Sequence, residues 1–279
     1  MAANPNMQIL GLQAIPRLAE RKGIKLNGFL TYSDLYGVTA EQFQIALERC
    51  RETLDQLTKI SAISWWDVYS NSDIGMERLA LAKDIALEGK DTVLELGCGR
   101  GYFTVAAAKL SKRVVGLDVM DGLGRRGWWT NFNSAIALLN LGQKVSGCKA
   151  DAQAIPLPDA FVKKVVAVHS IRNFMSKTII QNIVREMYRV LSNDGEMTIA
   201  ENISTANNKS QEAHLVMLKC KSKYDWGDLF YFSQEELLRL LEEAGVKNAQ
   251  VKVVDYNLSA APPLFVLNTS RLRKGQVEQ

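Results

Sequence analysis

Histidine and paired cysteines are what this chain has least of. It has two histidines, His169 and His214, and its four cysteines, at positions 50, 98, 148 and 220, form no CxxC pair. These spacings exclude the usual zinc-ligand patterns and a disulfide framework. No apolar run approaches the ~20 residues of a membrane span, and residues 1–5 lack the basic and hydrophobic stretches of a secretory signal. We therefore expect no metal site, no transmembrane segment and a cytoplasmic protein.

The overall composition is that of an ordinary globular protein. The chain has 279 residues, a net charge of +4, 47% hydrophobic and 23% charged residues, which permits one large domain with an appended cap. The mild basic excess is spread along the chain and is not interleaved with aromatics, so nucleic acid is not indicated as a partner.

The most informative segment is Asp91–Thr104, in which a short apolar stretch leads into closely spaced glycines. Residues 92–96 predict a buried strand, and a helix is predicted after the glycines. Because glycines carry no Cβ, a ligand can approach this backbone closely. The helix N-terminus then offers free N–H groups to an anionic ligand group. Doubly wound α/β sheets bind nucleotide-like cofactors at such a turn.

The spacing within this turn discriminates between cofactors. A dinucleotide fingerprint requires a small residue where this chain has Tyr102, so a nicotinamide cofactor is disfavoured. An acid at the strand end, Glu95, instead suits a ligand with an ammonium group. Residues 95–101 resemble the first motif of the class I S-adenosylmethionine-dependent methyltransferases. The resemblance implies S-adenosyl-L-methionine as the cofactor, bound by Glu95, Gly97, Cys98, Gly99 and Gly101.

Two later segments extend the resemblance. Arg113–Asp118 predicts a second strand ending in an acid about 20 residues beyond the turn, where an acid commonly binds both ribose hydroxyls; Val119 adjoins it. Residues 150–161 resemble the family's loop after the third strand. There the resemblance implies that Asp151 and the backbone N–H of Ala152 bind the adenine edge. An α/β domain with incidental glycines and acids is the alternative, and several motifs in order disfavour it.

The fold expected is α/β: a Rossmann-like, doubly wound, seven-stranded sheet, mostly parallel with an antiparallel last strand. Residues 1–60 are predicted to form an N-terminal helical cap and residues 61–279 the methyltransferase domain. The first 30 residues or so are expected to be partly loose, whereas Thr39 and Gln42 predict a capping box that opens a helix. The later strands are predicted at Val165–Ser170, Glu196–Ala200, Gln250–Tyr256 and Pro263–Asn268.

Aromatic residues suggest where an acceptor binds. Residues 204–232, after the fifth strand, are long for a connection and are predicted to be a substrate lid. We assign Tyr224 and Trp226 of this segment to the acceptor pocket, together with Trp128 and Trp129, which follow the second strand. Ordinary helix packing is the competing interpretation of the tryptophans.

Methyl transfer is an in-line displacement that depends mainly on orientation, so no catalytic triad is required. His169, at the end of the fourth strand, is a candidate base, cofactor contact or acceptor contact. A hydrogen-bonded histidine without a chemical role is the alternative. Arg172 is a candidate anchor for an anionic or carbonyl acceptor, and a solvated loop arginine is nearly as plausible.

The segment after the fourth strand also bears on the acceptor. It lacks an Asn/Asp-Pro-Pro-Tyr/Phe motif, common in enzymes of this fold that methylate base or amide nitrogens. Ile171–Asn173 and Met187–Leu191 are similar to segments of the ubiquinone/menaquinone-biosynthesis methyltransferases. We therefore expect a methyltransferase acting on a small-molecule or lipid-like acceptor. A protein or tRNA acceptor, and a non-catalytic cofactor-binding subunit, remain alternatives, as do monomer and homodimer.

Overall fold

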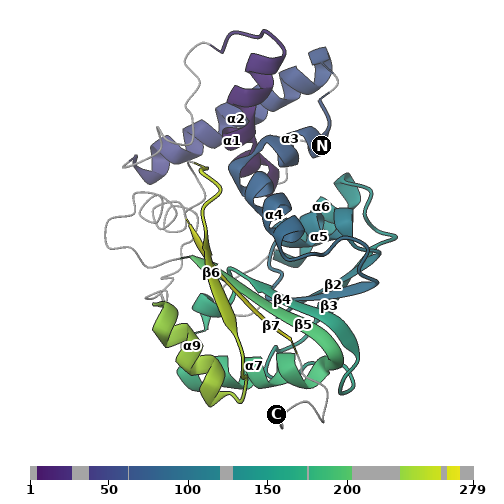
Figure 1. The fold of residues 1–279 in the computed structure, drawn as a ribbon. Helices are drawn as coiled ribbons and strands as arrows, with labels where there is room; N and C mark the ends of the chain where they lie inside the picture. The colour runs from purple at the N-terminus through teal and green to yellow at the C-terminus, as the bar shows by residue number, and fades with distance from the viewer. Residues whose placement is uncertain are drawn as a thin grey trace.

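The computed structural model describes residues 5–26, 38–61, 63–119, 128–174, 176–202, 233–258 and 263–270. A group of N-terminal helices lies beside a layered α/β part (Figure 1). The helices are α1 (Pro5–Arg21), α2 (Ala40–Ser61), α3 (Trp65–Asn71), α4 (Asp73–Asp84), α5 (Tyr102–Leu110), α6 (Trp128–Leu138), α7 (Lys177–Val190) and α9 (Gln234–Glu243), with a 3-10 turn η2 (Ile171–Asn173). The strands are β1 (Thr92–Leu96), β2 (Arg113–Asp118), β3 (Val145–Lys149), β4 (Val162–Val168), β5 (Leu191–Asn202), β6 (Gln250–Val254) and β7 (Leu264–Ser270).

The seven strands form one sheet in the order β3-β2-β1-β4-β5-β7-β6. Strands β1 to β5 pair in parallel, and β7 is antiparallel to both β5 and β6. This arrangement confirms the predicted mixed, mostly parallel sheet. The strand order reverses between β1 and β4, and ligands of open α/β sheets bind at the carboxyl ends of the strands beside such a reversal.

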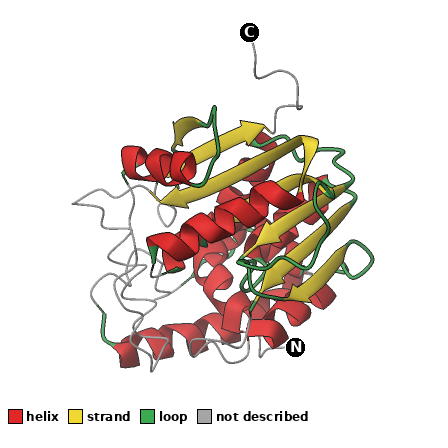
Figure 2. Cartoon of the chain, turned by 90° about the horizontal axis from the view of Figure 1, so that it is seen from below, coloured by secondary structure: helices red, strands yellow, loops and turns green. Residues whose placement is uncertain are grey.

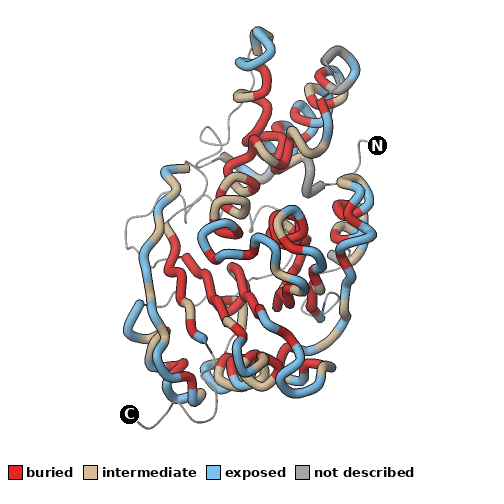
Figure 3. Tube along the Cα trace, turned by 45° about the vertical axis from the view of Figure 1, so that its right-hand side comes forward, coloured by how far each residue is buried: buried red, intermediate tan, exposed pale blue. Residues whose placement is uncertain are grey.

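Helices cover both faces of this sheet (Figure 2), and the side chains along each central strand alternate between the two faces. On β1, Val93 packs with the cluster that contains α4 and α5, whereas Leu94 and Leu96 pack with the cluster that contains α7 and α9. Figure 3 shows the central strands buried along most of their length. Strands that are buried on both faces have nearly continuous apolar sequences. The central strands could therefore be predicted from the sequence.

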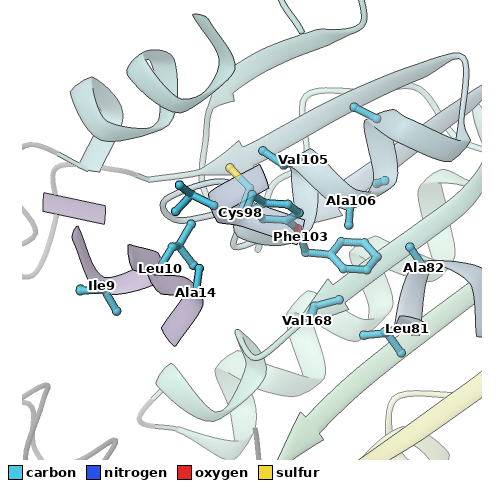
Figure 4. Close-up of a cluster of buried hydrophobic side chains, with 14 of the residues drawn as sticks. Ile9, Leu10, Ala14, Leu81, Ala82, Cys98, Phe103, Val105, Ala106 and Val168 are labelled. Carbon is cyan, nitrogen blue, oxygen red and sulfur yellow. The ribbon is translucent and has the colours of Figure 1, made fainter. Parts of the chain in front are cut away.

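Helix α1 forms part of the first 30 residues, of which residues 1–4 and 27–30 lie outside the described residues. Residues 5–21 are helical even though Pro16 lies inside the helix, because tertiary packing compensates for the proline. Gly11 lets α2 approach: a Cβ there would lie 2.6 Å from Leu54 Cδ1 and 2.8 Å from Cys50 Sγ. Figure 4 shows Leu10 and Ala14 of this helix in the same buried cluster as Cys98 of the glycine turn.

Local signals were accurate for one helix cap and for the first two strands, whereas β4, β5 and β6 have other bounds than predicted. The capping box is present, since the Thr39 N–H donates to Gln42 Oε1 at 2.9 Å and the Gln42 N–H donates to Thr39 Oγ1 at 3.2 Å. Strands β1 and β2 have the predicted bounds. Strand β4 instead starts at Val162, which pairs with Leu191 before the register shifts to Lys164 and Glu196. Among the described residues, no helix is both long and apolar enough to cross a membrane.

Candidate cofactor and acceptor site

The glycine turn between β1 and α5 is folded against the end of β2. The N–H groups of Gly97 and Cys98 both donate to Leu117 O, at 2.8 and 3.1 Å. Gly97 has a φ of +66°, and a Cβ there would lie 2.5 Å from the Ser170 Cβ. Glycine is therefore required at position 97 both by backbone conformation and by the close approach of β4's end.

Asp118 joins this turn to the end of β2. Its Oδ2 accepts a hydrogen bond from the Gly99 N–H at 2.9 Å, and its carbonyl accepts one from the Ala150 N–H at 3.1 Å. The neighbouring Val119 is 37% exposed. One carboxyl end of the sheet thus brings together the glycine turn, the β2 acid and the start of the loop after β3.

That loop presents the two residues expected at the adenine. Asp151 is exposed, and its Oδ1 accepts a hydrogen bond from the Gln153 N–H at 2.8 Å. Ala152 is buried. The loop is held from the other side, because the Ile155 N–H donates to Glu186 Oε2 at 2.8 Å.

Glu95 lies under α5 and has little contact with solvent. Its side chain is buried, at 2% exposure, and the Thr104 hydroxyl donates to its Oε2 at 2.5 Å. Burial raises the pKa of Glu95 to about 8, against the lowering effects of Thr104 and of the nearby Arg78 charge. The carboxyl is therefore largely protonated at neutral pH and would ionise beside a cation.

His169 lies at the end of β4 with both ring nitrogens close to oxygen atoms. Nδ1 is 2.6 Å from Asn202 Oδ1, at the end of β5, and Nε2 is 3.0 Å from Glu77 Oε1, in α4. Its backbone is left-handed, with a φ of +51°, a conformation uncommon outside glycine. The ring is part of a protein hydrogen-bond network and is not free in the site.

Arg172 is buried beside the same strand ends, which excludes the expected alternative of a solvated loop arginine. Its Nη1 donates to Asn202 Oδ1, and its backbone N–H lies 3.4 Å from Glu201 Oε1. The Ile171 N–H donates to that same oxygen at 2.7 Å. Burial raises the pKa of Glu201, opposed chiefly by the charge of Arg172.

The predicted aromatic pocket is only partly described. Trp128 opens α6, and Tyr224, Trp226 and the whole predicted lid, residues 204–232, lie outside the described residues. Trp129 is half-buried and stacks on Phe132 with ring centroids 5.6 Å apart. A Cβ on Gly147 of β3 would lie 2.1 Å from the Trp129 ring. Trp129 therefore packs on β3, and the pocket assignment stays a prediction.

Sequence reasoning missed three members of this site. Glu77 and Asn202 contact His169, and Phe132 lies beneath the turn, 2.9 Å from where a Gly101 Cβ would be. No local signal identifies Glu77, because it belongs to a helix outside the sheet and meets His169 across 92 positions of sequence. Within the described residues, no group of three His, Cys, Asp or Glu side chains is arranged to hold a metal ion.

A doubly wound sheet with a glycine turn and a β2 acid at its carboxyl edge defines a nucleotide-cofactor-binding α/β enzyme fold. The methyltransferase domain family matches residues 94–199, which include that turn, that acid and β4. These residues form a class I S-adenosylmethionine-dependent methyltransferase domain, as the sequence predicted.

Known proteins resemble this chain over parts of its length. The ubiquinone/menaquinone biosynthesis C-methyltransferase UbiE of Neisseria meningitidis is 32% identical over 119 residues, 36% of this chain and 47% of that protein. The match thus spans about half the length of that curated relative. The 23S rRNA (uracil(1939)-C(5))-methyltransferase RlmD of Alcanivorax borkumensis is 36% identical over 83 residues, 28% of this chain and 19% of that protein. A solved S-adenosylmethionine-dependent methyltransferase from Aquifex aeolicus shares the fold, with a TM-score of 0.50, 19% identity and coverage of 70% of this chain and 90% of that one.

Proposed function

We propose that the chain transfers a methyl group from S-adenosylmethionine to a small-molecule or lipid-like acceptor. The observation that carries the proposal is the bond from the Gly99 N–H to Asp118, with the loop after β3 tied to the same residue. In this proposal the turn, Asp118 and the loop bind the amino-acid, sugar and base parts of the cofactor in turn.

The residues present suit the chemical groups of that cofactor. We assign the cofactor ammonium to Glu95 with the turn of Gly97, Cys98, Gly99 and Gly101, the ribose hydroxyls to Asp118, and the adenine edge to Asp151 and the Ala152 N–H; Val119 and His169 complete the predicted contacts. The buried Glu95 carboxyl has a raised pKa and is largely neutral before the cofactor binds. A cationic partner would then be accompanied by ionisation of the carboxyl, so no unpaired charge is buried in the free protein.

In this proposal the bound cofactor supplies an already activated methyl group. The protein then has to align the acceptor and exclude water, and orientation of this kind is worth about 7–11 kcal/mol. His169 and Arg172 line the end of β4 and would contact the acceptor there.

The acceptor class is favoured by similarity rather than by geometry. The similarity to a methyltransferase of quinone biosynthesis supports a small or lipid-like acceptor, as does the Ile171–Asn173 triplet. The shorter similarity to an rRNA methyltransferase is the observation that keeps a macromolecular acceptor as the second candidate.

A methyl-transfer assay tests the proposal. The protein is incubated with S-adenosylmethionine labelled in its methyl group and with fractionated lysate of the source cells. We expect label in the lipid or small-metabolite fraction. Label confined to protein or RNA would overturn the acceptor class, and a protein that binds the cofactor without transferring label to any fraction would be a non-catalytic subunit.

A further inference from the structure

The two partners of His169 determine its protonation. Asn202 Oδ1 also receives the Arg172 guanidinium, so the amide presents its oxygen, an acceptor, to the ring. Glu77 presents a carboxylate oxygen to the opposite nitrogen. Because both partners accept, the ring can bond to both only when both nitrogens carry protons, that is, as the imidazolium.

The charges around the ring come from three elements. They are Glu77 and Arg78 from α4, Arg172 from η2, and Glu201 from β5. The positive charges of Arg78 and Arg172 disfavour protonation of the His169 ring. The Glu77 carboxylate favours it, because its Oε1 lies 3.0 Å from His169 Nε2. Since the Glu77 and His169 side chains are only 3% and 9% exposed, their attraction is weakly screened by solvent.

The end of β4 holds the backbone of His169 next to the residue that meets the glycine turn. The His169 N–H donates to Ala200 O at 2.9 Å, and Asn173 Nδ2 donates to the His169 carbonyl at 3.1 Å. The next residue, Ser170, packs against Gly97. His169 therefore follows the strand that meets the glycine turn, in a backbone conformation held from both sides.

We propose that Glu77 is a positioning residue of the methyltransferase: it holds His169 protonated and oriented, so that His169 faces the acceptor as a fixed cation and not as a general base. This inference rests on the proposed function. It also indicates the acceptor's chemistry, an ionisable hydroxyl or enol, because a nearby cation favours the anionic form of such a group.

The reaction then balances without a protein base. The acceptor loses its proton to water and is held as the anion. A bond forms from its oxygen or enolate carbon to the methyl group while the sulfur–methyl bond breaks, and that electron pair stays on sulfur. Glu77 keeps its negative charge throughout, and its Oε1 contacts both the His169 ring and the Arg78 guanidinium.

Histidine NMR tests the charge directly, because His169 and His214 are the chain's only histidines. The full chain is labelled with ¹⁵N-histidine, saturated with S-adenosylhomocysteine and titrated from pH 5 to 9, with His214→Gln used for assignment. We expect doubly protonated His169 signals at neutral pH. In Glu77→Gln the ring should lose its proton at lower pH, and Glu77→Asp should restore part of the difference.

Turnover provides the second measurement. With the lipid extract of the lysate as the acceptor probe, Glu77→Gln should lower kcat by at least tenfold and shift the alkaline pH profile. Glu196→Gln is the matched control, because that glutamate lies in the middle of β5, pairs with Lys164 and is 44% exposed, and it should leave both readouts as in the wild type.

Each outcome is decisive. A neutral His169 at pH 7 in the wild-type protein, or a Glu77→Gln variant with the wild-type titration, overturns the inference even if turnover falls. A wild-type protein that binds no S-adenosylhomocysteine refutes the proposed function instead, and the histidine titration of the free protein still decides the role of Glu77.

Discussion

Asp118 Oδ2 accepts a hydrogen bond from the Gly99 N–H at 2.9 Å. The bond joins the last residue of β2 to the middle of the glycine turn, across 19 positions of sequence. The carboxylate thereby helps to fix the shape of the turn. The same side chain is thus part of the scaffold and, in the proposed function, the sugar ligand.

Replacing Asp118 should weaken cofactor binding strongly. Asp118→Ala removes the two predicted hydroxyl contacts, each worth about 1.5–3 kcal/mol, so we expect at least a hundredfold loss in affinity for S-adenosylmethionine by titration calorimetry. Asp118→Asn, which keeps an acceptor for Gly99, should lose less. Wild-type affinity in the alanine variant would show that the ribose is not bound there.

Alanine substitutions at Gly97 and Gly89 distinguish the cost of backbone strain from the cost of a steric clash. Both have positive φ, but a Cβ at Gly89 would meet nothing within 4 Å, whereas one at Gly97 would lie 2.5 Å from Ser170 Cβ. Gly89→Ala should cost about 1–2 kcal/mol of unfolding free energy from conformation alone. Gly97→Ala should cost more in urea unfolding, and equal costs would contradict the packing described.

The buried carboxyl of Glu95 should make stability fall as pH rises. Its pKa is raised by burial to about 8 in the folded protein, against about 4.3 in an unfolded chain. Between these values the folded state holds the extra proton, so its contribution is complete below about pH 4.3 and is lost as pH rises through about 8. In Glu95→Gln, the free energy of unfolding measured in urea should change less with pH between pH 5 and 9. The same pH dependence in the variant as in the wild type would show that other groups cause it.

Ligand binding should also release a proton from Glu95. If the cofactor ammonium pairs with this carboxyl, binding at pH 7 converts it to the carboxylate. Calorimetric enthalpies for S-adenosylmethionine should therefore vary with the ionisation enthalpy of the buffer, and Glu95→Gln should remove that variation. Buffer-independent enthalpies in the wild type would place the ammonium elsewhere.

The N-terminal helices should unfold together with the sheet. Leu54 and Ile45 both belong to α2. Leu54 is buried against α1, whereas Ile45 is 43% exposed. Leu54→Ala should cost about 2–5 kcal/mol, and Ile45→Ala only about 0.5 kcal/mol. A single thermal transition that moves only with Leu54→Ala would show one cooperative unit; a separate early transition would show an independent cap.

The sheet and the cofactor turn were predictable because their signals are local. An apolar run ending in glycines at 97, 99 and 101 determines a strand, a turn and a helix without reference to distant residues. The acid of Asp118 follows from strand length and spacing. Parallel pairing then brings these segments to one edge, since all their carboxyl ends point the same way.

The network around His169 was not predictable for the opposite reason. Glu77 reaches it from α4, and Asn202 reaches it from β5, so its chemistry depends on how a helix outside the sheet packs on the strand ends. Helix α1 was not identified from its sequence either, because it packs chiefly against α3 and α2 and lacks a clean apolar stripe. Tertiary packing overrode local propensity in both places.

The most direct test of the central claim is a crystal structure of the full chain with S-adenosylhomocysteine. We predict the amino-acid end over the turn from Gly97 to Gly101, the ribose hydroxyls on Asp118 and the adenine beside Asp151 and Ala152. A ligand bound away from the carboxyl ends of β1 and β2, or a crevice filled by side chains at saturating ligand, would contradict the account.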